Sequence, residues 1–257
     1  MSKPQSKMFG FITKTWSPVI GCAYSCSYCW AKKLVEKRLS KMLKAYETGF
    51  EPKFLPERLK KCESFTEKDF VFVCSMGDFM GEWVIPEWQN QVFGAIKKSS
   101  AKFLLLTKNP KDYVRLILAI PENCVLGATI ETDRDELVSY GSSPVSYAPL
   151  PSERWRAMEK LVMVGWHDLL ICLEPIMDFD LADVVNKIYT MSLLSECLKS
   201  LTIVIGYDNH KSCLIEPPLS KTMNLIERLE KMEKVKVVRK TLREPTCPET
   251  AKDKKVM

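Results

Sequence analysis

The sequence predicts an α/β protein with a mainly parallel sheet, because short strand-like runs alternate with longer amphipathic segments along most of its 257 residues. The strand-like runs are rich in β-branched and aliphatic residues and do not alternate between apolar and polar positions, which is typical of strands buried on both faces. The composition, 46% hydrophobic and 27% charged, is that of a globular protein with enough length for a large core.

These patterns place the individual strands and helices. Strands are expected at residues 10–19, 70–75, 103–107, 124–130, 169–173 and 201–205, with a seventh at 235–241 that could close one edge. Helices are expected at residues 30–48, 86–98, 152–163, 181–191 and 220–232. This alternation indicates an open or partial (β/α) barrel, although a doubly wound open sheet has the same local pattern.

The remaining segments predict one domain over residues 1–243 and a charged, frayed tail over residues 244–257. Residues 139–151 are rich in Ser, Pro, Gly and Tyr and predict a long loop that could cover a site. A polar N-terminal stretch and the lack of any run of about 18 apolar residues lead us to expect a cytoplasmic protein with no membrane partner. The 38 basic and 32 acidic residues give a net charge of +6, which permits an anionic partner without requiring one.

The ten cysteines include one tight group. Cys22, Cys26 and Cys29 have the spacing C-x3-C-x2-C in a loop between the first expected strand and the first expected helix. In a reducing compartment such a group indicates metal binding or catalysis rather than disulfides. Soft thiolates select zinc, copper or iron-sulfur clusters, and a cubane held by three cysteines leaves one iron open to an external ligand. The alternative is a zinc site completed by a distant cysteine, or a set of buried thiols.

The sequence around these cysteines resembles the radical S-adenosylmethionine (SAM) superfamily, whose motif has this spacing with an aromatic residue, here Tyr28, before the third cysteine. The resemblance is strongest to phage-type radical SAM proteins distantly related to the spore photoproduct lyase branch. It is carried by the blocks T-W-S-P-V-I-G-C, G-F-E-P-K-F-L-P-E-R-L, V-F-V-C-S-M-G-D-F, L-L-T-K-N-P, L-G-A-T-I-E-T and L-E-P-I, which begin at residues 15, 49, 71, 105, 126 and 173. The chain departs from these relatives at I-G-Y-D-N-H, residues 205–210, where they often have a Gly-Gly-Glu-like stretch.

The resemblance implies a partial (β/α)6 TIM-like barrel, a 4Fe-4S cluster on the three cysteines, and SAM as a second cofactor. It implies that one electron from the cluster cleaves SAM to a 5′-deoxyadenosyl radical, which abstracts a hydrogen atom from the substrate, and that a flavodoxin- or ferredoxin-type donor supplies the electron. By analogy with the photoproduct lyase branch, the substrate could be a nucleic acid or a modified nucleotide. The alternative is a non-catalytic iron-sulfur or zinc-binding protein with a binding or redox-sensing role.

In a β/α barrel the working residues lie at the C-terminal ends of the strands. Together with the resemblance, this rule nominates as SAM contacts one residue of the cysteine loop and a set of residues after successive strands, namely Tyr28, Ser75, Gly77, Asp78, Lys108, Thr129, Glu131 and Glu174. The alternatives are a capping role for Asp78, a surface position for Lys108 and a structural ion pair for Glu174. The sequence assigns no catalytic residue, and it leaves the roles of Cys74 and His210 open.

Overall fold

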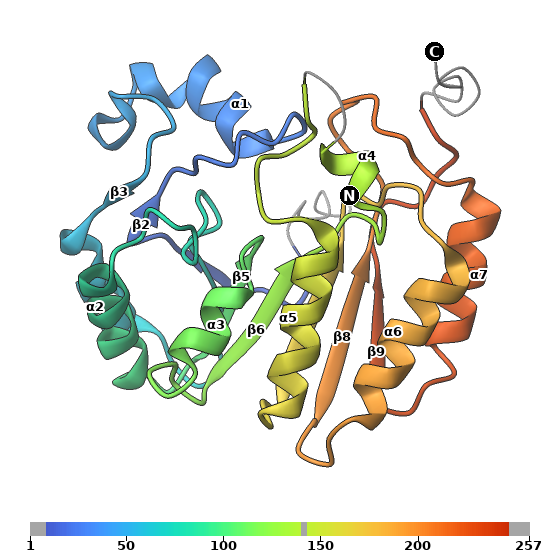
Figure 1. The fold of residues 1–257 in the computed structure, drawn as a ribbon. Coiled ribbons are helices and arrows are strands. Elements are labelled where there is room, and N and C mark those ends of the chain that lie inside the picture. The colour runs from blue at the N-terminus through green and yellow to red at the C-terminus, as the bar shows by residue number, and fades with distance from the viewer. Residues whose placement is uncertain (1–8, 140–142, 247–257) are drawn as a thin grey trace, which may run out of the picture. The chain divides into compact units, whose positions relative to one another are not determined.

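The computed structural model describes residues 9–139 and 143–246, and its strands and helices form an α/β architecture (Figure 1). The chain divides into two compact units. The first comprises Met1–Ala23 and Trp30–Gly127, and the second comprises Tyr24–Cys29 and Ala128–Met257. Within the described residues, no helix is long and apolar enough to cross a membrane.

The first unit is built on four neighbouring strands in the order β1-β4-β5-β6. Their bounds are Lys14–Trp16, Phe70–Val73, Lys102–Thr107 and Cys124–Thr129, the last two residues of β6 falling in the second unit. β4 pairs in parallel with both β1 and β5. Trp16 is buried between these strands, and its ring lies edge-on to Phe103 with 6.1 Å between the centroids. A separate antiparallel ribbon joins β2, Val19–Ile20, to β3, Lys53–Phe54.

Helices in the first unit follow its strands. They are α1 at Trp30–Lys37, α2 at Pro86–Lys97 and α3 at Lys111–Leu116, with 3-10 turns η1 at Leu39–Lys41, η2 at Lys44–Tyr46 and η3 at Pro56–Ser64. α2 begins with a proline, whose missing N–H is not needed in the first turn, and buries Val92, Phe93 and Ile96 at helical spacing.

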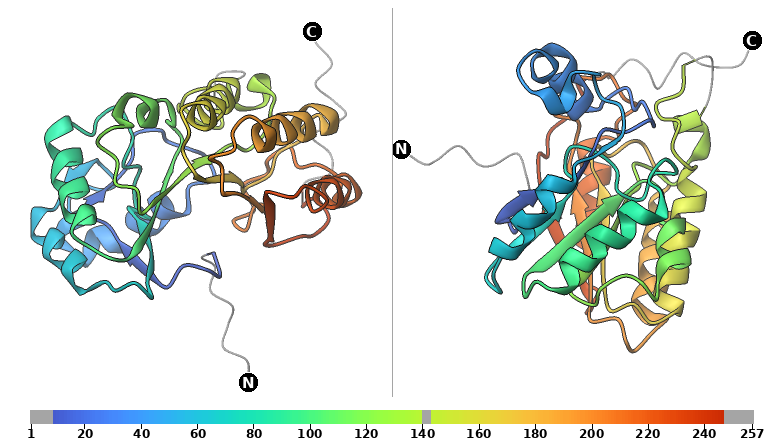
Figure 2. Two further views of the ribbon diagram at one scale, coloured as in Figure 1. Left: turned by 90° about the horizontal axis from the view of Figure 1, so that it is seen from below. Right: turned by 90° about the vertical axis from the view of Figure 1, so that its left-hand side faces the viewer.

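The second unit has parallel strands in the order β7-β8-β9, with bounds Asp168–Leu173, Ser200–Ile205 and Val235–Arg239. Its helices are α4 at Asp135–Ser139, α5 at Pro151–Met163, α6 at Leu181–Leu193 and α7 at Leu219–Leu229. Helices α5, α6 and α7 lie on one side of these strands (Figure 2). α6 begins after Asp180, whose carboxylate accepts a hydrogen bond from the Asp183 amide at 2.9 Å.

Two expected elements are wrong in extent. The expected strand at residues 10–19 is split into β1 and β2, because Pro18 between them has no N–H to donate to a strand partner. The expected helix at residues 30–48 ends at Lys37 and continues as η1 and η2. Within this stretch Val35, Leu39, Ala45 and Tyr46 pack onto the local core. The step of six residues from Leu39 to Ala45 does not match the spacing of three or four residues on one face of a helix.

The class and most other elements agree with expectation. Four expected helices and the remaining strands are present with ends shifted by at most three residues, and the edge strand expected at 235–241 is β9. Short helices α3 and α4 were not expected. In each unit the strands follow chain order, whereas a doubly wound sheet reverses its order at a switch point, so neither unit is doubly wound.

Candidate functional site

The cysteine loop lies between β2 and α1, and it is held at both ends by backbone hydrogen bonds. Cys22 donates its N–H to the Phe50 carbonyl at 3.1 Å, and Cys29 donates to the Cys26 carbonyl at 3.0 Å, which closes a tight turn. Cys22, Cys26 and Cys29 are all half-buried, and none forms a disulfide. The three thiols are therefore partly accessible and are not joined in disulfides.

Gly21, immediately before Cys22, attaches this segment to the turn after β4. Its N–H donates to the Met76 carbonyl at 2.9 Å, and it forms a parallel bridge with Gly77. Gly21 has φ +79, and a Cβ there would lie 2.1 Å from the Glu51 carbonyl oxygen. Only glycine fits this position. The first unit thus brings Cys22 close to the predicted residues Ser75, Gly77 and Asp78.

Asp78 anchors that turn to the end of β5. Its carboxylate accepts hydrogen bonds from the Thr107 hydroxyl at 2.6 Å, the Lys108 N–H at 2.9 Å and the Met80 N–H at 3.1 Å. Burial raises the pKa of Asp78, and these donors partly offset the rise. The predicted residues Asp78 and Lys108 are in contact, through the Lys108 backbone. The half-buried Ser75 and Gly77 lie in the same turn.

Tyr28 of the cysteine loop belongs to a buried polar network in the second unit. Its hydroxyl donates to Glu131, and the other carboxylate oxygen of Glu131 accepts from Arg154 Nη1 at 2.6 Å. Both side chains of the Glu131–Arg154 ion pair are fully buried. Arg154 also donates to the Thr129 carbonyl at 2.9 Å. Burial and the negative charge of Glu131 raise the pKa of Tyr28 well above its usual range, so the hydroxyl stays protonated as a donor.

The loop after α4 pairs with the cysteine loop. Ser27 donates its N–H to the Val145 carbonyl and Tyr147 donates to the Tyr24 carbonyl, both at 2.9 Å. The Cys26 sulfur lies 3.1 Å from the Ser146 hydroxyl. Residues 139–151 were expected to form a loop that could cover a site, and the part of this segment around Ser146 contacts the cysteine loop. Residues 140–142 of the segment lie outside the described part of the chain.

Glu174 follows β7 and has a partner in the second unit. Lys240 Nζ lies 3.2 Å from its carboxylate, and Asn209 Nδ2 donates to it at 3.3 Å. Burial raises the pKa of Glu174, and the Lys240 ammonium opposes the rise. The ion pair considered as an alternative for Glu174 is therefore present, although 15% of the side chain stays exposed.

Sequence reasoning missed Arg154 and Lys240. Arg154 lies on the apolar stripe of α5 with Trp155, Met158 and Leu161, and a charge on a buried face requires an internal partner. That pattern could have revealed it. Lys240 directly follows the last strand, where the strand-end rule would also have nominated it.

The donor set at the cysteine loop fits an iron-sulfur cluster chemically. Among the described residues, no three His, Cys, Asp or Glu side chains stand close enough together to hold a metal ion. However, burial raises the pKa of Cys62 to about 11 and of Cys74 to about 12, which keeps these thiols protonated, whereas the three loop cysteines are half-buried. Cys74 is thus a poor ligand, and His210 is exposed.

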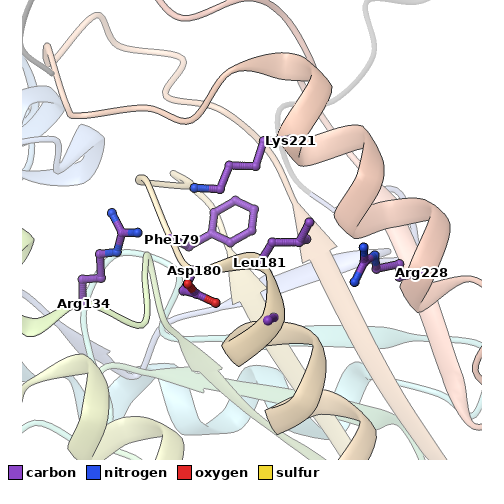
Figure 3. A pocket seen from close by; sticks show the side chains of 7 residues that line it. Arg134, Phe179, Asp180, Leu181, Lys221 and Arg228 are labelled. Atoms are coloured by element: carbon purple, nitrogen blue, oxygen red, sulfur yellow. The ribbon is translucent and has the colours of Figure 1, made fainter.

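A cavity of about 380 Å³ lies elsewhere in the second unit, beside the start of α6 (Figure 3). It is lined by Arg134, Phe179, Asp180, Leu181, Ala182, Lys221 and Arg228. Asp178 pairs with both Arg134, at 2.6 Å, and Lys221, at 2.8 Å, so both cations have an ion-pair partner within the protein. None of the predicted site residues lines this cavity.

Comparisons with known proteins place this geometry among related folds. A family model described as "Protein of unknown function (DUF5131)" matches residues 6–144. None of the curated proteins matches the sequence. A spore photoproduct lyase variant with bound AdoMet and dinucleoside spore photoproduct is 11% identical, with a TM-score of 0.56 over 89% of this chain and 65% of that one.

Two further solved structures have a similar fold. Another spore photoproduct lyase variant is 10% identical, with a TM-score of 0.63 over 88% of this chain and 76% of that one. SuiB of Streptococcus suis is 12% identical, with a TM-score of 0.53 over 90% of this chain and half of that one. At these identities the likeness shows a shared fold. The chain spans less than two thirds of the first of these structures, 65%.

Proposed function

The chain belongs to the family described as protein of unknown function (DUF5131), and we propose that it is a radical SAM enzyme. The observation that carries the proposal is the C-x3-C-x2-C loop, whose three cysteines are half-buried and form no disulfide, in a chain that shares the fold of a protein solved with bound AdoMet. We propose that the strands of the two units correspond to the partial (β/α)6 barrel that the sequence resemblance implies.

In this proposal Cys22, Cys26 and Cys29 hold a 4Fe-4S cluster through their thiolates. When bound, the cluster and SAM together supply one-electron cleavage of the sulfonium bond, giving methionine and a 5′-deoxyadenosyl radical that takes a hydrogen atom from the substrate. The chain's own residues orient the loop and exclude water. The Tyr28 hydroxyl anchors the loop by its bond to Glu131, and backbone hydrogen bonds join Ser27 to Val145 and Tyr147 to Tyr24.

The three acids among the proposed SAM contacts differ in how many hydrogen bonds they can still accept. A carboxylate offers about four acceptor positions. Asp78 uses three of them, and Glu131 is fully buried between Tyr28 and Arg154. Glu174 is the most exposed of the three acids and keeps unused acceptor positions beside Lys240. We therefore expect Glu174 to bind the SAM amino group directly, and Asp78 and Glu131 to position the loops that carry Ser75, Gly77, Lys108 and Thr129.

The proposed substrate class is a nucleic acid or modified nucleotide, by analogy with the photoproduct bound in the structural relative. An electron donor of the flavodoxin or ferredoxin type and a cytoplasmic location complete the proposal. The alternative is that the same thiols hold iron-sulfur or zinc for binding or redox sensing, without SAM chemistry.

Anaerobic reconstitution tests the proposal. We expect about four iron atoms per chain and, on reduction, an electron paramagnetic resonance (EPR) signal that changes when SAM is added. With dithionite the loaded protein should convert SAM to methionine and 5′-deoxyadenosine, because dithionite would reduce the cluster and chelation at the open iron would hold SAM beside it. A fully loaded cluster with neither product nor any spectral response to SAM would favour the sensing alternative.

Cysteine variants supply the matched controls. Cys26→Ala should abolish iron loading, whereas Cys62→Ala, at a buried protonated thiol, and Cys197→Ala, at an exposed one, should load normally. Iron content and visible absorbance measure this. Normal loading of the Cys26 variant would remove the basis of the assignment.

A further inference from the structure

The segment that directly follows the cysteine loop carries most of the chain's excess charge. Between residues 30 and 44 it has one acidic side chain, Glu36, against six basic ones, Lys32, Lys33, Lys37, Arg38, Lys41 and Lys44. This is a net charge of +5 in 15 residues, compared with +6 for the whole chain. Charge of one sign gathered on one surface attracts an oppositely charged partner and accelerates its encounter.

Large apolar side chains are exposed on the same segment. Trp30 is 41% exposed, Leu34 36%, Met42 62% and Leu43 46%, and these four are a third of the exposed large apolar residues in the described chain. The core does not need them, because the segment packs inward through Val35 and Tyr46 onto Ile20 and Leu55. We call Trp30, Leu34, Met42, Leu43 and the basic side chains of residues 30–44 the α1 face, and Figure 1 shows the backbone of α1 and of the turns that follow it.

The α1 face combines exposed apolar side chains with basic ones, and Trp, Met and Arg are enriched in protein-protein interfaces. Single-stranded nucleic acids are instead bound by successive aromatic side chains on which bases stack, and the α1 face offers only one aromatic ring. The chemistry of the face thus favours an acidic protein over a nucleic acid.

The position of the α1 face in the chain, directly after the cysteine loop, indicates what an acidic partner would do. Trp30 is the residue after Cys29, so a partner seated on the α1 face lies beside the cysteine loop. The proposed chemistry requires an electron to be delivered at this loop. We propose that the α1 face is the docking surface for a small acidic electron carrier, an inference that rests on the proposed function. One electron leaves the reduced flavin or iron-sulfur group of the carrier, which is oxidised by one electron, and the cluster is reduced by one electron.

A charge-reversal variant tests this on the cluster-loaded protein. Lys37→Glu, Lys41→Glu and Lys44→Glu are combined, and the control combines Lys60→Glu, Lys231→Glu and Lys236→Glu, which are exposed and cause the same change in net charge. Reduced flavodoxin, an acidic carrier, is mixed with each protein, and the loss of visible cluster absorbance gives the rate. At low salt we expect the first variant to be slower by about tenfold and the control by less than about twofold, with the difference shrinking at high salt.

Dithionite separates the two proposals, because this small reductant needs no docking surface. Both variants should be reduced by dithionite and cleave SAM like the wild type. Equal flavodoxin rates in the two variants, with dithionite cleavage intact, would overturn the docking face and leave the proposed function standing. If dithionite drives neither cleavage nor a SAM response in the loaded wild type, the proposed function fails, and the docking inference fails with it.

A second variant, Met42→Ser with Leu43→Ser, keeps every charge and removes two of the exposed apolar side chains of the α1 face. We expect it to weaken flavodoxin binding severalfold at high salt, where electrostatic attraction of the carrier is screened. Binding of a single-stranded oligonucleotide, measured by fluorescence anisotropy, should be the same in this variant and in the wild type. If the charge-reversal variant loses oligonucleotide binding but keeps its flavodoxin rate, the face binds nucleic acid and the carrier inference is wrong.

Discussion

Each carboxylate placed at a strand end is held by a partner within its own unit. Asp78 accepts from Thr107 and the Lys108 backbone, Glu131 pairs with Arg154, and Glu174 pairs with Lys240. These bonds offset the cost of removing the acids from water. They also orient the loops that bear the cysteines and the strand-end turns, so the same residues stabilise the fold and shape the candidate site.

The Glu131–Arg154 pair provides a stability test at the residue scale. Arg154→Met should destabilise the protein by about 3–5 kcal/mol, because it removes the cation that pairs with the fully buried Glu131 carboxylate. Adding Glu131→Gln removes that stranded charge, so the double variant should be more stable than Arg154→Met alone. Denaturant unfolding of the cluster-free protein measures both free energies.

An exposed pair serves as the control. Arg239 lies 2.8 Å from Glu230 with both side chains more than 40% exposed, so Arg239→Met should cost no more than about 1 kcal/mol. If Arg154→Met costs no more than Arg239→Met, the buried network does not hold the cysteine loop, and the positioning role given to Tyr28 and Glu131 is wrong.

Spacing alone identified the three cysteines, because a local motif needs no knowledge of the fold. The strand-end rule led to Asp78, Glu131 and Glu174, but it could not say which residues pair with them, and these partners lie 23 to 66 residues farther along the chain. Such pairings depend on which loops meet in space. The direct SAM contacts therefore remain predictions.

At the scale of elements, strong periodicity made long helices predictable and irregular segments difficult. α2, α5 and α6 have apolar stripes over at least 12 residues, and their ends were placed closely. α3 and α4 have six and five residues, too few for a periodic signal. The stretch after α1 contains good helix formers, but packing of Tyr46 against Ile20 and Val35 overrides that preference.

Gly21 provides the test at this scale, because it joins β2 to the cysteine loop. Gly21→Ala should lower iron loading and destabilise the protein by more than about 1 kcal/mol, since the new methyl group would meet the Glu51 backbone in a conformation that favours glycine. Gly94→Ala is the matched control. It lies within α2 with nothing near its Cβ position, and should stabilise the protein by about 0.5–1 kcal/mol.

Iron content and thermal unfolding of both glycine variants decide the matter. A Gly21 variant that loads iron and unfolds like the wild type would mean that the loop tolerates displacement from the Met76–Gly77 turn. The link between Cys22 and the predicted residues of that turn would then lose its support.

At the scale of the whole molecule, the matched family region and the folded structure have different limits. The family model ends at residue 144, yet residues 24–28 form hydrogen bonds or buried contacts with Val145, Ser146, Tyr147, Met177 and Leu214. The cysteine loop is therefore held by parts of the second unit that lie beyond the matched region. The cysteines proposed to bind iron and the residues that hold their loop come from different parts of the sequence.

A truncation after residue 144 tests this division. The shortened chain keeps all three cysteines and Glu131, but it loses Arg154, Met177 and Leu214, so the buried Glu131 carboxylate loses its ion-pair partner and Tyr28 loses two apolar neighbours. We expect it to bind far less than the full iron content and to show no cooperative unfolding by circular dichroism. A chain ending at residue 246, which removes part of the expected charged tail, should load iron and unfold like the full chain. Full loading and cooperative unfolding of the shorter chain would show instead that the matched region holds the cysteine loop by itself, and that the buried network of the second unit is dispensable for the metal site.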